Sequence, residues 1–540
     1  MKPNLSRRNL MQLALAPAAL GQAQVEDLRP TVSKVYPDSG GKLVYVPDEQ
    51  GNVIPDFSHA GYGGGGVAIP SVPVKETLWP VAGDNTANVQ AAIDKVSALP
   101  LDKNGFRGAL LLRAGYYKMA TPVKISASGV VLRGESMSDT GTILVGTGNP
   151  RRGPGGGTLV MIGGATAIAP KDDTKQTVTA DYVPLGSRTI PVTSAAGFKP
   201  GDNVIVRRIG NQDWIDFMGM GSKTNRFSWR PFNVDWDRVV VAVQGNTLTI
   251  DAPITCAIEK QWGGGEVLKY DDSARIERVG VENLRGMSEF DPTVRTKDYG
   301  NMDRPNYAPE EYYSDENHYW TFIAFNNFKN GWVRNVTALH FGNSLAGAQR
   351  GAKWVTVQDC VSREPISQRR GARRFTYLME GQLCLVQRCL SDQGRHSFIA
   401  GDPHASGHVF LDDVATHPFS SSESHASWAT GNLWDNVHAP LTARFWKDIN
   451  MGWAGGNDVF WNCEGPFLVQ KPPGAQNYSF GHMGVDSMVF NIAFQDPTKD
   501  NGYIESLDRH VTPRSLYLTQ LRERLGDAAV RNVAASNQTA

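Results

Sequence analysis

The sequence predicts an all-β solenoid, in which short strands wind into the stacked turns of a parallel β-helix. One short unit recurs along the C-terminal half of the chain: a β-rich run, a polar residue, Asn or Asp, and then Cys or Val. The copies follow one another at nearly constant spacing, and the segments between them leave no room for a long helix. These three observations together favour stacked turns over separate globular domains.

The recurring unit has six clear copies, whose last residues are 24, 29, 25, 23 and 26 positions apart. A period of about 20 to 50 residues is typical of solenoids. Spacing that varies by a few residues fits a β-helix, because extra residues can loop out of one turn without disturbing the stack. The copies occupy residues 332–336, 354–360, 383–389, 408–414, 431–437 and 458–463.

The last two positions of each unit predict a sharp corner followed by an inward-facing residue. Asn and Asp tolerate the left-handed backbone that such a corner requires. We therefore interpret Asp359 and Asp413 as corner residues rather than catalytic acids. The final Cys or Val is expected to face the core, and all five cysteines are interpreted as small apolar core residues. The corner positions are Asn335, Asp359, Arg388, Asp413, Asn436 and Asn462, and the inward positions are Val336, Cys360, Cys389, Val414, Val437 and Cys463.

The N-terminus predicts export. Ser6-Arg7-Arg8-Asn9-Leu10 is a twin-arginine signature, a short Ala- and Leu-rich run follows, and small residues end the segment near position 23. Residues 1–23 are therefore expected to be a twin-arginine signal peptide, which would make the protein periplasmic or secreted. No other stretch is long and apolar enough to span a membrane.

The rest of the chain is expected to form one main body with additions. Residues 24–74 are an N-terminal extension, and residues 75–510 form the β-helix. A helix that begins near Asp84 covers the open N-terminal end. Residues 175–260 lack the recurring unit and instead contain short strand-like runs, which predicts an inserted β-module. Residues 511–540 predict a C-terminal helix and a polar tail. The 54 basic and 54 acidic residues balance, so charge indicates neither a nucleic-acid nor a membrane partner, and we expect a monomer.

Several motifs resemble the pectate-lyase-like superfamily of right-handed parallel β-helices. They are Asp84-Asn-Thr with its helix, Gly115-Tyr-Tyr and Val131-Leu-Arg-Gly-Glu. The chain also resembles a less characterised branch of that superfamily at Gly394-Arg-His396 and Trp428-Ala-Thr-Gly431. The resemblance covers roughly residues 75–165 and 275–490. It implies the fold and action on an extracellular polysaccharide, but the superfamily includes lyases, hydrolases and binding proteins.

Two better-marked subfamilies of this superfamily do not fit. Polygalacturonase-like hydrolases carry an Asp pair, which Asp412-Asp413 matches, but their other motifs are absent. Pectate lyases carry Arg-x-Pro-x-x-Arg, and the stretch from Arg363 to Arg369 is one residue too long. The catalytic residues of these enzymes therefore cannot be carried over to this chain.

The stretch 363–396 is unusually basic, with seven arginines against three acids. Arg binds carboxylates in bidentate fashion, which favours a substrate that contains uronic acid. β-Elimination needs a group that neutralises the carboxylate, a base for the C5 proton and an acid for the leaving oxygen. Arg373 or Arg374 suits the first role, His396 or His425 the second and Tyr377 the third. The predicted catalytic residues are Arg374, His396, His425, Tyr377 and Arg395, and the predicted substrate contacts are His340, Glu364, Arg373, Trp428, Arg444 and Trp446.

Two alternatives remain open at this point. A glycoside hydrolase would need two carboxyl groups, which the chain offers at Glu364, Glu380, Asp402, Asp412, Glu423 and Asp435. A non-catalytic carbohydrate-binding protein is the other. We predict no metal site; Ca²⁺ could replace an arginine as the neutralising group, although no loop matches a calcium motif.

Overall fold

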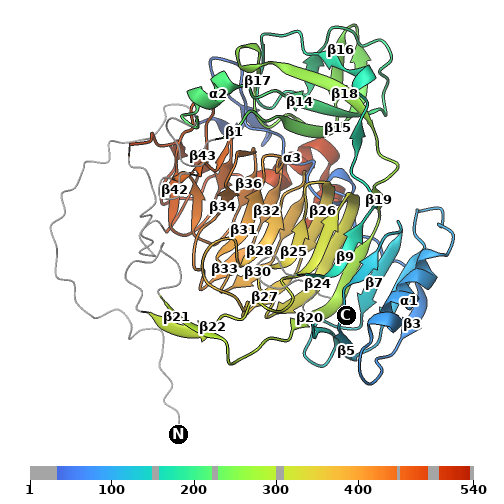
Figure 1. Ribbon diagram of the computed structural model, residues 1–540. Helices are drawn as coiled ribbons and strands as arrows, with labels where there is room; N and C mark the ends of the chain where they lie inside the picture. Colours follow the sequence, from blue (N-terminus) through green and yellow to red (C-terminus); the bar gives the residue numbers. More distant parts are fainter. Residues whose placement is uncertain are drawn as a thin grey trace, which may run out of the picture.

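The protein is described by a computed structural model that covers residues 33–148, 157–221, 229–298, 309–446, 451–484 and 498–534. The expected signal peptide, residues 1–23, lies outside this described part. The main body is a coil of stacked turns, and a smaller module lies on one side of it (Figure 1). The predicted right-handed parallel β-helix is confirmed. No helix within the described ranges is long and apolar enough to cross a bilayer.

Three parallel sheets form the walls of the coil, and a typical middle turn contributes one strand to each sheet. The first sheet contains β3 (Val74–Leu78), β4 (Gly108–Leu112), β7 (Val130–Gly134), β20 (Gly280–Ser288), β24 (Phe328–Leu339), β26 (Ala352–Gln358), β29 (Leu385–Gln387), β32 (Val409–Leu411), β36 (Leu433–Asp435), β41 (Val459–Trp461), β43 (Tyr478–Phe480) and β44 (Tyr503–Glu505). The second contains β5 (Gly115–Met119), β8 (Thr142–Gly146), the C-terminal halves of β20 and β24, β27 (Val361–Arg363), β30 (Leu390–Asp392) and β33 (Val414–Thr416).

The third sheet carries the candidate site. It contains β6 (Val123–Ile125), β9 (Thr158–Gly163), β23 (Thr321–Asn326), β25 (Ser344–Ala348), β28 (Phe375–Met379), β31 (His396–Gly401), β34 (Ser422–His425), β37 (Leu441–Ala443) and β42 (Phe467–Val469). Its strands are parallel and lie side by side along the coil. Side chains two residues apart on a strand therefore share a face, and equivalent side chains on neighbouring strands stack about 4.8 Å apart.

Two columns of left-handed residues make the corners on either side of the second sheet. The first column has φ between 50° and 57°, and consists of Asn283, Asn335, Asp359, Arg388, Asp412, Asn436 and Asn462. The second column has φ between 48° and 67°, and consists of His340, Glu364, Gln393 and His417. Corner formation, which the sequence predicted for the first column, also explains the polar residues of the second.

The corner prediction was wrong by one position in a single turn. Asp412 is the left-handed residue there, with φ 56°, and the register pairs Leu390 with Val414. Asp413 therefore occupies the inward position that Cys389 occupies one turn earlier, and Val414 is partly exposed instead of buried. Asp413 is fully buried, and its Oδ1 accepts a hydrogen bond from the backbone N–H of Cys389 at 2.8 Å.

The Asp413→Asn variant is expected to lose less stability than the natural protein as the pH rises from about 4 to 8. Burial raises the pKa of Asp413 well above its usual value, so the folded state binds a proton that the unfolded chain releases. Stability then falls by up to about 1.4 kcal/mol per pH unit between the two pKa values. Asn keeps the acceptor for Cys389 and cannot ionise. Thermal unfolding across this pH range checks the prediction. Asp412→Asn is the control and should keep the natural protein's dependence of stability on pH. If Asp413→Asn and the natural protein lose the same stability over this pH range, the prediction is wrong.

The interior of the coil is apolar and continuous. Cys360, Cys384, Cys389 and Cys463 are buried there, and Cys256 is buried in the module, all with free thiols. This confirms the interpretation of the cysteines as core residues. An inner stack of aromatic rings runs along the axis between consecutive turns, with centroids 5.1 to 6.2 Å apart: Tyr377, Phe398, Phe410, Trp434 and Phe460.

Helices cover the N-terminal end of the coil and one of its sides. The N-terminal capping helix, α1 (Thr86–Ser97), packs Val89, Ile93 and Val96 into the end of the coil, as predicted. The C-terminal segment forms α3 (Leu516–Leu525) and α4 (Asp527–Ala534). These two helices lie against the outer side of the first sheet, where Leu516 and Leu521 pack with Leu433 and Val459. The N-terminal extension, with β1 (Val35–Pro37) and β2 (Leu43–Tyr45), covers the same side.

The inserted module is an antiparallel sheet with its own core. Its path is β10 (Ala169–Pro170), β18 (Gly265–Asp271), β14 (Asn203–Arg208), β15 (Val234–Gln244), β16 (Thr247–Ile250) and β13 (Thr189–Pro191), with the short α2 (Gln212–Phe217) beside it. Its apolar core extends onto the coil through Trp428, Phe445 and Trp453. Within the described part of the chain, no apolar cluster covers the outward side of β28, β31 or β34.

Candidate active site

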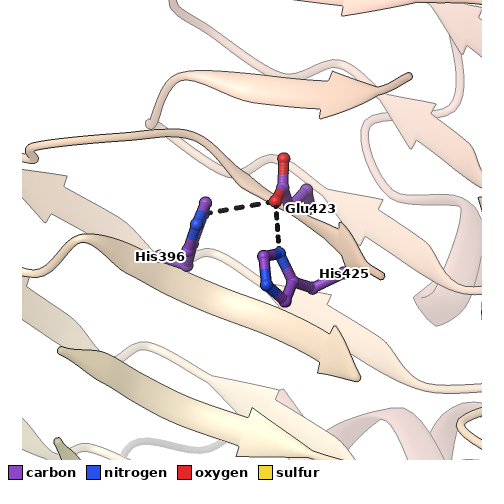
Figure 2. Close-up of side chains that lie close together, drawn as sticks. All are labelled: His396, Glu423 and His425. Carbon is purple, nitrogen blue, oxygen red and sulfur yellow. Dashed lines mark hydrogen bonds and ion pairs between the residues drawn. The ribbon is translucent and has the colours of Figure 1, made fainter. Parts of the chain in front are cut away.

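The third sheet brings three chemically active side chains together on its outward face. Inward side chains of β28 and β31, such as Tyr377 and Phe398, belong to the aromatic stack. Glu423 and His425 are two residues apart on β34 and therefore share the opposite face. The register pairs Ile399 with Glu423, and His396 on the neighbouring strand reaches the same carboxylate (Figure 2).

Glu423 is the centre of this group. Its Oε1 accepts a hydrogen bond from Nδ1 of His425 at 2.7 Å and lies 3.4 Å from Nδ1 of His396. Its Oε2 accepts hydrogen bonds from the hydroxyls of Ser421 at 2.9 Å and Thr442 at 2.6 Å. The side chain is fully buried, so these donors replace the water that an exposed carboxylate would bind.

The surroundings keep Glu423 ionised and His396 neutral. Burial acts to raise the pKa of Glu423, but His396, Arg444 and His425 outweigh it, and the pKa lies below its usual range. Burial, with the positive charge of Arg395, holds the pKa of His396 well below its usual value. A neutral His396 donates Nδ1–H to the carbonyl of Ser421 at 2.5 Å. Its buried Nε2 has no hydrogen-bond partner among the described residues.

His425 is the member of the group that reaches solvent. Its side chain is 14 % exposed, whereas those of His396 and Glu423 are fully buried. Because Nδ1–H donates to the ionised carboxylate, the lone pair is on Nε2, which is the arrangement of an oriented general base. Within the described residues, no side chain or backbone group bonds to that nitrogen.

A guanidinium and two aromatic rings complete the surroundings. Arg444 follows β37 at the position equivalent to His425, and its Nη2 lies 3.4 Å from Oε2 of Glu423. The same guanidinium stacks over the ring of Trp446, 3.6 Å from its centroid. Phe375 contacts both histidines, with ring centroids about 5 Å apart. These contacts hold the guanidinium of Arg444 and the imidazole of His425 in place before any ligand binds.

The donor set does not suit calcium. The ligand atoms of His396, Glu423 and His425 lie within 4.8 Å of one another, and two imidazoles with one carboxylate could hold a transition-metal ion. Ca²⁺ takes six to eight oxygen ligands, about 2.3 to 2.6 Å away, and these residues provide at most two. The guanidinium of Arg444 already provides positive charge beside the carboxylate, which disfavours a cation at the same place.

Of the eleven predicted site residues, the structure brings together His396, His425, Arg444 and Trp446. Arg395 lies beside them, over the ring of Phe375, and affects the pKa of His396. These residues come from three neighbouring turns, as expected for a site along one sheet of a β-helix.

The two other predicted arginines have structural partners. Arg373 makes a two-point contact with Glu316, through Nε at 2.5 Å and Nη2 at 3.0 Å. Arg374 is fully buried and donates to the carbonyl of Ser367 at 2.7 Å, and burial lowers its pKa to about 9. Neither guanidinium is placed on the outward face beside His425.

The remaining predicted residues lie elsewhere. Tyr377 points into the coil, where its hydroxyl donates to the carbonyls of Cys360 and Leu390, so it cannot act as the acid. His340 and Glu364 form a pair in the second corner column, 3.4 Å apart. Trp428 is 3 % exposed and packs against Trp214 of the module.

Sequence reasoning missed the role of Glu423. From the sequence it is named only among the carboxyls available to a hydrolase, whereas the structure places it on strand β34 (Ser422–His425), where Ser420–Ser424 are buried. The alternation Ser-Glu-Ser-His, which places Glu423 and His425 on one face of a strand, was the signal that could have revealed the pair.

Comparison with known proteins gives similarity of fold only. No protein-family model matches the chain, and no curated protein sequence matches it. The tailspike protein gp49 from Pseudomonas phage LKA1 aligns with 74 % of this chain and 55 % of its own, at 13 % identity and a TM-score of 0.42. This chain therefore spans little more than half of that tailspike.

Two further solved structures align over similar lengths. The polygalacturonase from Erwinia carotovora ssp. carotovora aligns over 77 % of both chains, at 11 % identity and a TM-score of 0.29. The gp54 tailspike of Acinetobacter baumannii bacteriophage AP22, solved with a capsular saccharide, aligns over 76 % of both chains, at 9 % identity and a TM-score of 0.25. At these values no catalytic residue can be transferred to this chain.

Proposed function

We propose that the chain is an exported enzyme that cleaves a polysaccharide containing uronic acid by β-elimination, with His425 as the base. The observation that supports this best is the pair formed by Glu423 and His425, 2.7 Å apart on the outward face of the third sheet. An ionised, buried carboxylate that orients a partly exposed imidazole is suited to removing a proton.

The elimination proceeds in two stages on one uronate unit. Nε2 of His425 takes the C5 proton, and the resulting charge spreads onto the carboxylate of the sugar, which the guanidinium of Arg444 stabilises. The electron pair at C5 then forms the C4–C5 double bond as the bond from C4 to the leaving oxygen breaks. Because Tyr377 lies inside the coil, the imidazolium of His425 returns the proton to that oxygen. Glu423 remains ionised throughout and stabilises the imidazolium.

The environment of Glu423 disfavours hydrolysis at this place. A glycosidase needs one protonated carboxyl as the general acid, whereas the pKa of Glu423 lies below its usual range. Four neighbouring side chains also occupy both of its oxygens. It is therefore suited to orienting a base, not to donating a proton.

Product analysis tests the proposed reaction. Purified mature protein is incubated with a panel of uronic and neutral polysaccharides, while the ultraviolet absorbance of the C4–C5 double bond and the number of reducing ends are followed together. The proposal predicts that both rise in parallel, and only with uronic polymers. Reducing ends without absorbance would contradict it.

Activity is expected to be the same in EDTA and in millimolar Ca²⁺. The reason is that the positive charge at the site belongs to Arg444, which no chelator removes. Initial rates on a soluble uronic oligosaccharide check this, since a polymer that calcium crosslinks would confuse the comparison. A loss of more than about tenfold in EDTA that a metal ion restores would show that a cation takes part.

A second candidate function, glycoside hydrolysis, is favoured by a different pair of carboxyls. Glu380 follows β28, where burial and the charge of Asp402 raise its pKa to about 7. The pKa of Asp402 is lowered despite its burial, mainly by hydrogen bonds from His404. Two carboxyls with separated pKa values can serve as acid and base. If hydrolysis is the reaction, Glu380→Gln silences the enzyme and His425→Ala does not; the lyase proposal requires His425.

Export is part of the proposal and rests on the N-terminal sequence. Secretion of a reporter fused to residues 1–30 is expected to depend on Arg7 and Arg8, because the twin-arginine route reads that pair. Replacement of both by Lys should retain the reporter in the cytoplasm. Unchanged export of the double variant would remove this part of the proposal.

A further inference from the structure

A polar cavity of about 380 Å³ lies outside the candidate active site. Its walls come from three parts of the chain: the N-terminal extension, the inserted module and the last turns of the coil. The volume falls in the range of small-ligand sites, about 300 to 1,000 Å³. Tyr182, Tyr478 and Tyr503 provide aromatic wall, and Asn52, Gln476 and Asn457 provide amides.

Tyr478 lines this cavity and has a hydroxyl that can reach a ligand there. It belongs to β43 and is only 7 % exposed, yet its side chain lines the cavity. Its hydroxyl makes no hydrogen bond with any described residue, and burial raises its pKa, so the phenol remains protonated at neutral pH. The hydroxyl is therefore free of protein partners within the described residues and can bond to a ligand in the cavity.

Other groups at the cavity are also available to a ligand. The side-chain oxygen of Gln476 accepts from the backbone N–H groups of Asn477 and Tyr503, which leaves its NH₂ without a described partner. Lys34 and Lys471 line the cavity and form no ion pair with a described residue. The carboxylate of Asp48 is already bound, since it accepts from the N–H groups of Gln50 and Asn52. With two lysines against one aspartate among its lining residues, the cavity has a net positive rim.

We propose that this cavity binds a short anionic oligosaccharide and is a second carbohydrate site, separate from the catalytic one. Tyrosine rings pack against sugar faces, the Tyr478 hydroxyl and the Gln476 amide bond to sugar hydroxyls, and Lys34 and Lys471 pair with sugar carboxylates. The choice of a uronic sugar rests on the proposed function; the presence of a ligand site rests on the cavity and Tyr478.

The cavity lies near the C-terminal end of the third sheet. Lys471 lies two residues beyond β42, the last strand of the third sheet, and β42 pairs with β37, which Arg444 follows. Asn477, next to Gln476 and Tyr478, donates to the carbonyl of Gln470 at the end of β42. A site at this end of the sheet would hold part of a polymer whose other part reaches His425.

Binding measured without turnover tests the proposal. Isothermal titration of the His425→Ala protein with trigalacturonate is expected to show a site that Tyr478→Phe and Lys471→Ala each weaken by about tenfold or more. Tyr478→Phe removes only a hydroxyl that has no described partner, so its melting temperature should match the parent and isolate the effect on binding. Lys103→Ala, an exposed lysine far along the sequence, is the matched control and should bind like the parent.

The outcomes separate this proposal from the proposed function. Unchanged affinity for trigalacturonate in both Tyr478→Phe and Lys471→Ala would overturn the second site, whatever the enzyme cleaves. Equal binding of neutral maltotriose would overturn its anionic character. If the natural protein cleaves no uronic polymer but trigalacturonate binding still depends on Tyr478, the proposed function fails and the second site stands.

Discussion

His425→Ala is expected to lower kcat on a uronic polymer by about 10²- to 10⁴-fold, the usual contribution of a positioned general base. The variant removes the imidazole whose Nδ1–H is held by Glu423 at 2.7 Å, and with it the only partly exposed base in the group. The fold should be retained, because the side chain lies on the outer surface of the third sheet and not inside the coil. Steady-state kinetics and a thermal melt on the same preparation check both statements.

A matched control separates the loss of the base from the loss of any histidine. His438→Ala removes a 58 % exposed imidazole that pairs with Glu464 at the surface, away from the third sheet, and should leave kcat within a factor of two or so. If His425→Ala turned over at the rate of His438→Ala, His425 would not be the base, and the carboxyls Glu380 and Asp402 would become the leading candidates.

Glu423→Gln is expected to lower the free energy of unfolding by about 3 to 5 kcal/mol, the usual cost of breaking a buried ion pair from one side. The carboxylate is fully buried, and Arg444, with a side chain only 2 % exposed, lies 3.4 Å from it. The neutral amide removes the negative charge that faces that guanidinium. Activity should also fall by at least about tenfold, because the imidazole of His425 loses the carboxylate that stabilises its protonated form. Urea denaturation near neutral pH gives the first quantity.

A double-mutant cycle and the pH dependence sharpen this second prediction. Because Arg444→Met removes the guanidinium that faces Glu423, Glu423→Gln with Arg444→Met should cost less than the sum of the single changes. The pKa of Glu423 is lowered in the folded state, so its contribution to stability is present above the unfolded value near 4.5 and is lost as the pH falls. The variant should therefore lose less stability on acidification. Glu464→Gln, at a 48 % exposed carboxyl, is the control; strictly additive costs in the cycle would contradict the proposed ion pair.

The fold could be predicted because a β-helix repeats its constraints in every turn. One corner such as Asn436 would mean little, but a column of such residues at solenoid spacing fixes the period and the inward position that follows. The prediction went wrong at Asp413, where two adjacent acids fit the corner equally well and only the register, Leu390 opposite Val414, decides between them. The C-terminal helix could be predicted from its periodicity, but its place against the first sheet depends on contacts across hundreds of residues.

The candidate site was predicted less well, for a related reason. The sequence predicted His396, His425, Arg444 and Trp446 from their chemistry, and the structure places them on neighbouring turns. Nothing local shows that Arg373 pairs with Glu316, because that contact joins segments 57 residues apart in the sequence. Nor does the sequence show which face of the third sheet Tyr377 occupies, because the bend of the chain at the start of β28 determines which side chains of that strand point into the coil.

The polar residues after the corners were the other source of error. His340 and Glu364 suited a binding surface by chemistry, but their backbone, with φ of 67° and 51°, belongs to the second corner column. Polar residues that recur once per turn can therefore serve the bend of the chain as well as a ligand. Burial and contacts distinguish the two roles, and both depend on the folded coil.

Mass spectrometry of the products from a defined uronic oligosaccharide tests the central claim most directly. Elimination breaks the glycosidic bond without adding water, so the fragment that carries the new non-reducing end is lighter by one water than a hydrolysis product. We predict that the natural protein yields this dehydrated fragment and that His425→Ala yields almost none. Fully hydrated fragments on both sides of the cleaved bond would contradict β-elimination and place the chemistry on carboxyls such as Glu380 and Asp402.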